Sequence, residues 1–330
     1  MSSFVASIRL KFWYLPRRQR QAIAAAVVLL GVYGPVLAVG LSIEPPVGLD
    51  TARLDRFLPG QAQVGSRELG EIRTAKVGQL FARFERQGYD LDLVVAGRSD
   101  APRAFLASLP EDWTSLTEAA ERKRAFVMVM LPLVLRANER ILADRRRVLA
   151  ADARLSKGEQ IHDGERGWLG RLARAYELDE VDLRDLRWRV DVVPPSLAIA
   201  QAAIESGWGT SRFVGEGNAL FGEWTEQGRG GMIPEGRDPG RTYAIRRFGT
   251  LGESIASYIR NLNTHGAYRQ FRARRAELRR RGEPLDGALL VETLSAYSEQ
   301  GRTYVTTVRS IITENGLGDL DRVELQTGRR

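Results

Sequence analysis

The stretch from 194 to 209 constrains the fold of this chain more than any other part of its sequence. The pair Pro194-Pro195 is excluded from a helix interior but suits a first turn, and every residue from 196 to 204 except Gln201 is small or apolar. A helix of this composition has no polar face to turn toward water, so it is buried on nearly all sides. We therefore predict a short central helix around which the other elements pack.

The predicted helix ends in a carboxylate. Glu205 is followed by Ser-Gly-Trp-Gly at 206–209, and glycine permits the backbone angles that end a helix. A carboxylate there faces the negative end of the helix dipole, and aromatic neighbours exclude water from it; both effects raise its pKa. The aromatic residues that follow are Trp208, Phe213, Phe221 and Trp224. We expect Glu205 to donate a proton near neutral pH; the alternative is a solvated surface glutamate.

Two motifs around Glu205 resemble the signature of one enzyme family. The segments 202–209 (Ala-Ala-Ile-Glu-Ser-Gly-Trp-Gly) and 217–222 (Gly-Asn-Ala-Leu-Phe-Gly) are similar to those of bacterial glucosaminidases that cut peptidoglycan, glycoside hydrolase family seventy-three. The Bax-type proteins of Gram-negative bacteria show the closest resemblance, which covers roughly residues 131 to 320. It implies a mainly α, lysozyme-like (α+β) domain with a small β lobe, and hydrolysis without a metal or cofactor.

Composition excludes several kinds of site. The chain has 330 residues, no Cys and two His, which excludes disulfides and thiol catalysis and argues against a His/Cys metal site. The net charge of +8 favours anionic surfaces. The sequence has no basic motif interleaved with aromatic residues, so we do not expect nucleic acid as a partner, and a solvated Arg-rich surface accounts for the charge.

The N-terminal part predicts a membrane segment. Residues 1–20 are basic, and no residue from 22 to 43 is charged. The predicted transmembrane helix, 21–43, is close to the roughly 20 residues that span a bilayer, and its basic flank leaves the N-terminus in the cytoplasm. We expect a single-pass inner-membrane protein whose remaining chain lies in the periplasm. The alternative is a cleavable signal peptide, with Val36-Leu-Ala38 before the cut.

The rest of the chain divides by composition. We expect a helical stalk or accessory region at 44–124, the glucosaminidase domain at 125–322 and a frayed tail at 323–330. The apolar run at 125–135 is too short to span a bilayer and predicts a buried helix. Glycines and aromatic residues between 207 and 252 favour a β-containing lobe. Apolar spacing predicts helices at 68–86, 125–149, 168–176, 251–262, 268–281, 289–297 and 305–315.

Glycoside cleavage needs a proton donor and a group that stabilises or captures the positively charged sugar. We assign the donor to Glu205. The second group is commonly a carboxylate, and Glu235 occupies the place most similar to the family's second glutamate, although the usual Thr-Thr-Glu-Tyr pattern is absent. The carboxylates on offer are Glu223, Glu226, Glu235 and Asp238. Two alternatives remain: Glu235 is an exposed loop carboxylate, or the N-acetyl group of the substrate itself attacks the anomeric carbon.

The resemblance also implies residues that line a cleft. Tyr297 and Tyr304 match the first and last aromatic residues of the family's Gly-Tyr-Ala-Thr-Asp-Pro-X-Tyr segment, so Tyr297 is expected beside the acid as a catalytic residue, or else packed in the core. Asn218 either bonds the substrate or stabilises a turn. His265 is expected to cap a helix end. The expected substrate-binding residues are Trp208, Asn218, Phe221, Trp224 and Tyr304.

These expectations describe an anchored envelope enzyme that hydrolyses the glycan strands of peptidoglycan. The resemblance, rather than the residues, places the cut at N-acetylglucosaminyl bonds. A lytic transglycosylase is the first competing interpretation, because it uses a similar Glu-Ser-Gly helix end, forms an anhydro product and needs no second carboxylate. A non-catalytic glycan-binding protein on the same fold is the second. The expected partners are peptidoglycan and, through residues 21–43, the inner membrane.

Overall fold

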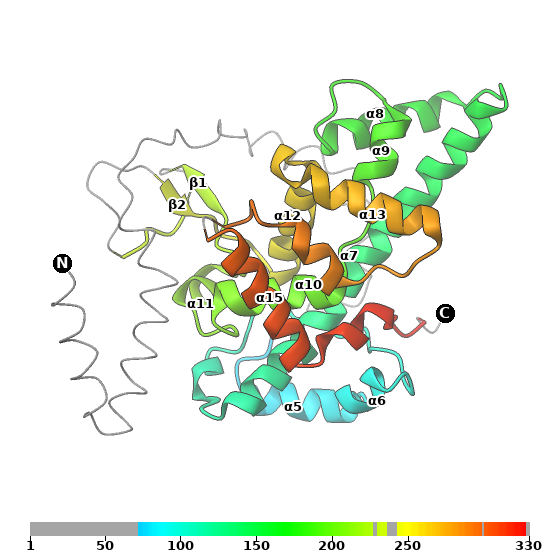
Figure 1. The fold of residues 1–330 in the computed structure, drawn as a ribbon. Coiled ribbons are helices and arrows are strands. Elements are labelled where there is room, and N and C mark those ends of the chain that lie inside the picture. Colours follow the sequence, from blue (N-terminus) through cyan, green and yellow to red (C-terminus); the bar gives the residue numbers. More distant parts are fainter. Residues whose placement is uncertain (1–71, 227–229, 236–242, 299, 328–330) are drawn as a thin grey trace, which may run out of the picture. The chain divides into compact units, whose positions relative to one another are not determined.

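The computed structural model describes residues 72–226, 230–235, 243–298 and 300–327 (Figure 1). The chain forms two units, one of Asp50–Pro234 with Thr242–Arg330, and one of Met1–Leu49 with Glu235–Arg241, of which Glu235 is described. The predicted transmembrane helix lies outside the described residues. Within the described ranges, no helix is long and apolar enough to cross a membrane.

Helices dominate the larger unit, as predicted, and are joined by a small two-stranded sheet. In chain order the elements are α5 (Val77–Arg86), α6 (Leu91–Val95), η1 (Trp113–Ser115), α7 (Ala119–Ser156), α8 (Asp163–Ala175), α9 (Leu183–Arg189), α10 (Pro195–Ser206), α11 (Arg212–Gly217), β1 (Trp224–Glu226), β2 (Tyr243–Ile245), α12 (Leu251–Thr264), η2 (Gly266–Tyr268), α13 (Arg269–Arg281), α14 (Gly287–Leu290), η3 (Val291–Thr293), α15 (Arg302–Glu314) and η4 (Leu317–Arg322).

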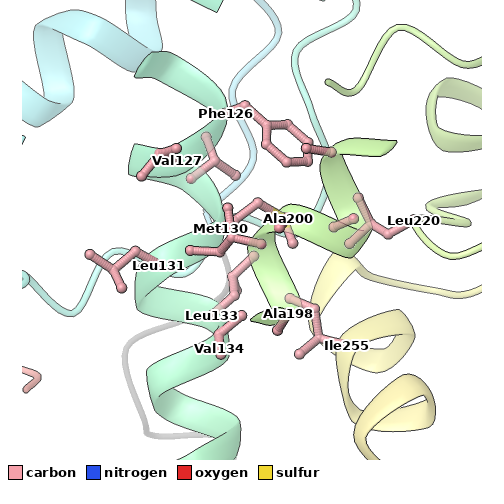
Figure 2. Packing of buried hydrophobic residues seen from close by; sticks show 14 of the residues in the cluster. Phe126, Val127, Met130, Leu131, Leu133, Val134, Ala198, Ala200, Leu220 and Ile255 are labelled. Carbon is pink, nitrogen blue, oxygen red and sulfur yellow. The ribbon is translucent and has the colours of Figure 1, made fainter. Parts of the chain in front are cut away.

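The central helix is α10, and this prediction is confirmed. Its residues from Pro195 to Ala203 are all buried, and it packs against α7, α14, α15 and η4. Figure 2 shows apolar side chains of α7, among them Met130 and Val134, beside Ala198 and Ala200 of α10. The small alanines let the surrounding helices approach the α10 backbone closely. The position of Glu205 is therefore set by the packing of one rigid helix.

The longest element is α7, which starts earlier and ends later than predicted. Its apolar run, 125–135, is fully buried, and the helix continues through Pro132. Beyond this run, Val148 and Ala151 leave the main core and join a second hydrophobic cluster with α8 and α9. The helix α7 therefore contributes to both clusters. Its apolar run packs in the main core with α10, and its later residues pack with α8 and α9.

A buried ion cluster holds the two hydrophobic clusters together. Asp191, after α9, lies between Arg279 at 3.0 Å, Arg145 at 3.4 Å and Arg275 at 4.0 Å. Burial opposes the negative charge, but the three guanidinium groups outweigh it and lower the pKa of the Asp191 carboxyl. The buried Arg275 also donates to the carbonyl of Trp188. Helices α7 and α13 are therefore tied to the end of α9.

The described part of the predicted accessory region shares the main core. Residues of α5, α6 and η1 pack with those of α7, α10 and α12 in one cluster. Backbone bonds join this segment to distant parts of the chain: the N–H of Leu251 donates to the carbonyl of Ala107 at 2.8 Å. The segment is part of the larger unit, and its Trp113 bonds the carbonyl of Trp208, three residues after Glu205.

The predicted β lobe is small. Strands β1 and β2 are antiparallel, with Trp224 opposite Ile245 and Glu226 opposite Tyr243. Gly231 lies close to both strands: a Cβ there would lie 2.7 Å from the Cβ of Ala244 and 2.8 Å from Cγ2 of Thr225. A larger residue at this position would force the two segments apart.

Two expectations about the C-terminal part are wrong. Instead of one helix at 289–297, α14 and η3 end by Thr293, whose hydroxyl bonds the carbonyl of Leu290 and competes with a continuing helix. The tail is not frayed after Asp321, since Leu325 is buried and pairs with Ala101 in a parallel bridge. Apolar contact and backbone bonding hold it through Gln326.

Candidate active site

Glu205 lies in the last turn of α10, where the backbone turns sharply out of the helix. Gly207 follows in the left-handed conformation, with φ of 59°, and the N–H of Trp208 donates to the carbonyl of Ala203 at 2.8 Å. Trp208 also has a positive φ, 58°, which is unfavourable for a bulky residue. The tertiary contacts of Trp208 therefore hold this exit in place.

The Glu205 carboxyl has the protonation behaviour that the sequence predicts. Burial raises its pKa from 4.5 to about 6, and a hydrogen bond from the hydroxyl of Tyr304 to Oε1, at 2.9 Å, opposes this rise. Desolvation is the dominant cause. With a pKa of about 6, Glu205 is half protonated near pH 6 and about a tenth protonated at pH 7, which is within the range in which a carboxyl acts as a general acid.

The aromatic residues around Glu205 include two tyrosines that the family resemblance places in the cleft, Tyr297 and Tyr304, and two that were not expected there. Tyr258, Tyr268, Tyr297 and Tyr304 all interact electrostatically with its carboxyl. The ring of Tyr297 stacks on that of Tyr304 with centroids 5.4 Å apart. Burial raises the pKa of each of the four hydroxyls, so they remain neutral donors. The site therefore surrounds Glu205 with neutral phenols.

A buried polar chain connects these tyrosines to α10. The hydroxyl of Tyr258 donates to Oε1 of Gln201 at 2.6 Å, and Nε2 of Gln201 donates to the hydroxyl of Tyr304 at 2.9 Å. Phe221 stacks on Tyr258, with centroids 3.9 Å apart, and is itself buried. Phe221, expected to bind substrate, thus supports the wall of the site.

A second carboxylate with an unusual environment is Glu223. Its Oε2 accepts from the Ser257 hydroxyl at 2.6 Å, Arg246 lies 3.9 Å away, and its buried Oε1 has no hydrogen-bond partner among the described residues. Burial raises its pKa despite these partners. Tyr268 interacts with both Glu205 and Glu223. Glu223 is therefore electrostatically linked to the same tyrosine as the acid.

The predicted second carboxylate, Glu235, is exposed and belongs to the smaller unit. Its catalytic role stays a prediction. Asp238 lies outside the described residues. Glu226 ends β1 opposite Tyr243.

Trp208 packs inward more than expected for a cleft residue. Its ring meets that of Phe126 edge-on at 5.8 Å, and the ammonium of Lys123 lies 5.1 Å from the ring centroid. Its carbonyl accepts from the indole N–H of Trp113 at 3.0 Å. These contacts explain how the strained exit from α10 is stabilised, and they connect it to the segment before α7.

Trp224 is the most open aromatic side chain of the lobe. It is 60% exposed, and its ring stacks on Tyr243 with centroids 4.5 Å apart and an angle of 13° between planes. Tyr243 is half-buried, so the pair presents one flat aromatic face to solvent, which makes it a candidate binding surface. The expected role of Trp224 in substrate binding is compatible with this geometry.

Asn218 and His265 both hold local backbone structure; the predicted cap of His265 is confirmed, and substrate binding by Asn218 stays a prediction. Nδ2 of Asn218 donates to the carbonyls of Phe248 at 3.2 Å and Gly249 at 3.3 Å, which fixes a turn. Nδ1 of His265 accepts from the N–H of Ala267 at 3.2 Å and caps η2. Neither group is directed at Glu205 by a hydrogen bond in the described structure.

Two further kinds of site are relevant among the described residues, a metal cluster and a surface groove. In these ranges, no three His, Cys, Asp or Glu side chains are grouped as a metal site would require. A polar groove of about 720 Å³ runs along α15 beside Arg302, Thr306 and Arg309. Along the helix these residues alternate with the buried Tyr304 and Val308, so the groove follows the outer face of α15.

Sequence reasoning missed part of the network. Gln201 is the one residue from 196 to 204 that is neither small nor apolar, and this was its signal. Tyr258 and Tyr268 lie in or beside predicted helices, where a tyrosine in the active site has the same pattern as one in the core.

Two comparisons relate this chain to known proteins. Residues 184–317 match the family model described as "Glucosaminidase: Mannosyl-glycoprotein endo-beta-N-acetylglucosaminidase", a range that contains Glu205 and all four tyrosines. "Protein bax" of Escherichia coli (strain K12) is 32% identical over 204 residues, which cover 60% of this chain and 71% of that relative. No solved structure matches significantly. The chain therefore belongs to the family of Bax-type, glucosaminidase-like proteins.

Proposed function

We propose that this protein is a peptidoglycan hydrolase that cleaves N-acetylglucosaminyl bonds of the glycan strands, with Glu205 as general acid. The observation that carries the proposal is a partly buried glutamate with a pKa of about 6 at the end of the central helix, surrounded by neutral tyrosines. Such a group protonates a leaving oxygen near neutral pH. The family match supports the reaction class.

The second catalytic function has two candidates. In the first, Glu235 stabilises or attacks the developing oxocarbenium ion, as the family resemblance implies. In the second, the N-acetyl carbonyl of the substrate attacks the anomeric carbon, and the enzyme supplies the acid alone. The tyrosines around Glu205 are compatible with the second route. Because they are neutral, none of them offers a negative charge to stabilise the oxocarbenium ion, and that role is left to the N-acetyl group.

Substrate binding is proposed to use the stacked pair Trp224 and Tyr243. Apolar faces of sugar rings pack against flat aromatic surfaces, and this pair offers such a surface with one ring 60% exposed. The other expected contacts, Tyr297 and Tyr304, lie beside the acid itself.

A lytic transglycosylase is the competing function. It is favoured by the same observation as substrate assistance, namely the tyrosine environment of the acid. Mass spectrometry of purified peptidoglycan digested by the full chain separates the two: the proposal predicts reducing N-acetylglucosamine ends. Anhydro ends identify a transglycosylase. Intact strands that are retained by the protein identify a glycan-binding protein.

We further propose that residues 21–43 anchor the chain in the inner membrane with Pro45 onward in the periplasm. The support is the uncharged run from 22 to 43 behind a basic flank. A reporter that requires export, fused after Gly48, is expected to be active. A reporter that works there only in the cytoplasm would contradict the topology.

A further inference from the structure

Gln201 is the polar residue in the apolar face of α10, and it is completely buried. A buried primary amide is costly unless its groups find partners. Both of its ends do: Oε1 accepts from Tyr258 at 2.6 Å, and Nε2 donates to Tyr304 at 2.9 Å. It lies four residues before Glu205, so the two side chains share one face of the helix.

The bonds form a chain with one direction. Each hydroxyl has a single proton, so the Tyr304 oxygen, which accepts from Gln201, turns its own proton to Oε1 of Glu205 at 2.9 Å. The proton of Tyr258 is likewise committed to Oε1 of Gln201. An amide is the group that sets this direction, because its donor and its acceptor are different atoms.

We propose that Gln201 is a positioning residue that keeps Oε1 of Glu205 as a hydrogen-bond acceptor, so that the proton for the leaving group resides on Oε2. This inference rests on the proposed function, since it assigns a role within the same reaction. Gln201 does not touch substrate; it acts through Tyr304. The consequence is that the acid presents its proton from a defined oxygen rather than from either.

Four groups of the described residues interact with the Glu205 carboxyl and bear on its pKa. They come from α12 (Tyr258), η2 (Tyr268), the turn after η3 (Tyr297) and α15 (Tyr304). All four are neutral phenols, and the bond from Tyr304 is the one that stabilises the charged carboxylate. Loss of that bond therefore raises the pKa of Glu205 above about 6.

A purely structural Gln201 predicts something different. If the amide only satisfies two buried hydroxyls, its removal lowers the free energy of unfolding and leaves the pH dependence of the remaining activity unchanged. A positioning residue changes the pH profile and kcat even when stability is restored by lower temperature.

The test uses the full chain acting on purified peptidoglycan, with kcat, KM and the pH profile measured for Gln201→Met, Tyr304→Phe and the double variant. Gln201→Met keeps the volume and removes both bonds. We expect kcat to fall on the order of 10-fold to 100-fold with KM changed by less than about 3-fold, and the basic limb to move to higher pH in both single variants. The double variant is expected to be little worse than either, because both break one chain.

Gln201→Glu is the second variant and guards against poor folding. Its length matches Gln201; when protonated it can donate to Tyr304, and when ionised it cannot. Its activity is therefore expected to recover at acid pH relative to Gln201→Met. Tyr176→Phe, a hydroxyl loss outside the Glu205 environment, is the matched control and is expected to keep the wild-type profile.

Additive effects in the double variant, or an unchanged pH profile in Gln201→Met, would overturn the inference. The proposed function is judged separately. If Glu205→Gln retains cleavage, the proposed function fails. If Glu205→Gln is inactive while Gln201→Met behaves as wild type, this inference alone fails.

Discussion

The hydroxyl of Tyr304 donates to Oε1 of Glu205 across 2.9 Å, although 99 positions separate the two residues. Tyr304 lies in the first turn of α15, and Glu205 in the last turn of α10. The packing of these two helices places a neutral donor on the acid that burial has made difficult to ionise. The pKa of Glu205 therefore depends on the packing of α10 against α15.

Glu205→Gln separates chemistry from folding. The amide keeps the size of the side chain and its bond from Tyr304 but has no acidic proton. Because general acid catalysis contributes about 10²–10⁴-fold, glycan cleavage is expected to fall by at least that range. Release of soluble fragments from purified peptidoglycan measures the change, and circular dichroism checks the fold. A folded variant with wild-type turnover would remove Glu205 from the mechanism.

The same variant is expected to be more stable at neutral pH. The pKa of Glu205 is about 6 in the folded chain and 4.5 ordinarily, so its stabilising contribution is complete below pH 4.5 and is lost as the pH rises through about 6. Glu205→Gln removes a penalty of about 2 kcal/mol at pH 8. Urea unfolding at pH 4 and pH 8 measures this. Exposed Glu180→Gln is the control, and a gain equal at both pH values contradicts the argument.

Tyr304→Phe is expected to move the acid to higher pH. The hydroxyl bond lowers the pKa of Glu205, so its loss raises the value above about 6. The ring and its stacking on Tyr297 are kept, which limits the change in packing. A carboxyl-carbon NMR titration of Glu205 measures the pKa directly. A pKa equal to or lower than that of the wild type is incompatible with the bond.

Asp321 is expected to be important for the start of α10. Its carboxyl accepts from the N–H and hydroxyl of Ser196, at 2.8 and 2.7 Å, and from the N–H of Gly287 at 2.9 Å. Asp321→Ala leaves these buried donors without partners and should lower the free energy of unfolding by about 2–4 kcal/mol. Denaturant unfolding measures the loss. Asp319→Ala, an exposed change in the same element, is the control, and equal stability of the two variants contradicts this role.

Glu235→Gln and Glu223→Gln distinguish the routes for the second catalytic function. If Glu235 is the second carboxylate, its variant loses kcat strongly and stays folded, whereas substrate assistance predicts little change. Glu223 is half-buried and accepts a hydrogen bond from Ser257, so Glu223→Gln is expected to change stability more than turnover. Turnover and thermal unfolding of both variants give the comparison. Near-wild-type turnover of Glu235→Gln excludes Glu235.

Trp224→Ala tests the lobe surface. Removal of an exposed ring stacked on Tyr243 is expected to raise KM about 5-fold to 30-fold, or roughly 1–2 kcal/mol, with kcat nearly unchanged. Leu155→Ala, an exposed apolar change at the end of α7, is the control. An unchanged KM means that the glycan binds elsewhere.

The sequence by itself determined the central helix, its carboxylate end and the family. Local rules suffice there: the proline pair at 194–195 starts α10, its apolar run requires burial, and Gly207 ends it beside Glu205. Helix positions followed from 3.6-residue spacing, with errors at the ends, because capping side chains such as Asp286 set those ends locally.

Only the tertiary structure decided which residues surround Glu205. Tyr297 and Tyr304 were expected in the cleft from the family resemblance alone, whereas the local aromatic pattern pointed to residues close in sequence and gave no sign of Tyr258 and Tyr268. Sequence spacing gives the face of a helix but not the helix it meets. Gln201 is an example. The sequence shows that it is a polar residue in an apolar run, but only the packing of α12 and α15 against α10 shows that its two amide atoms bond Tyr258 and Tyr304.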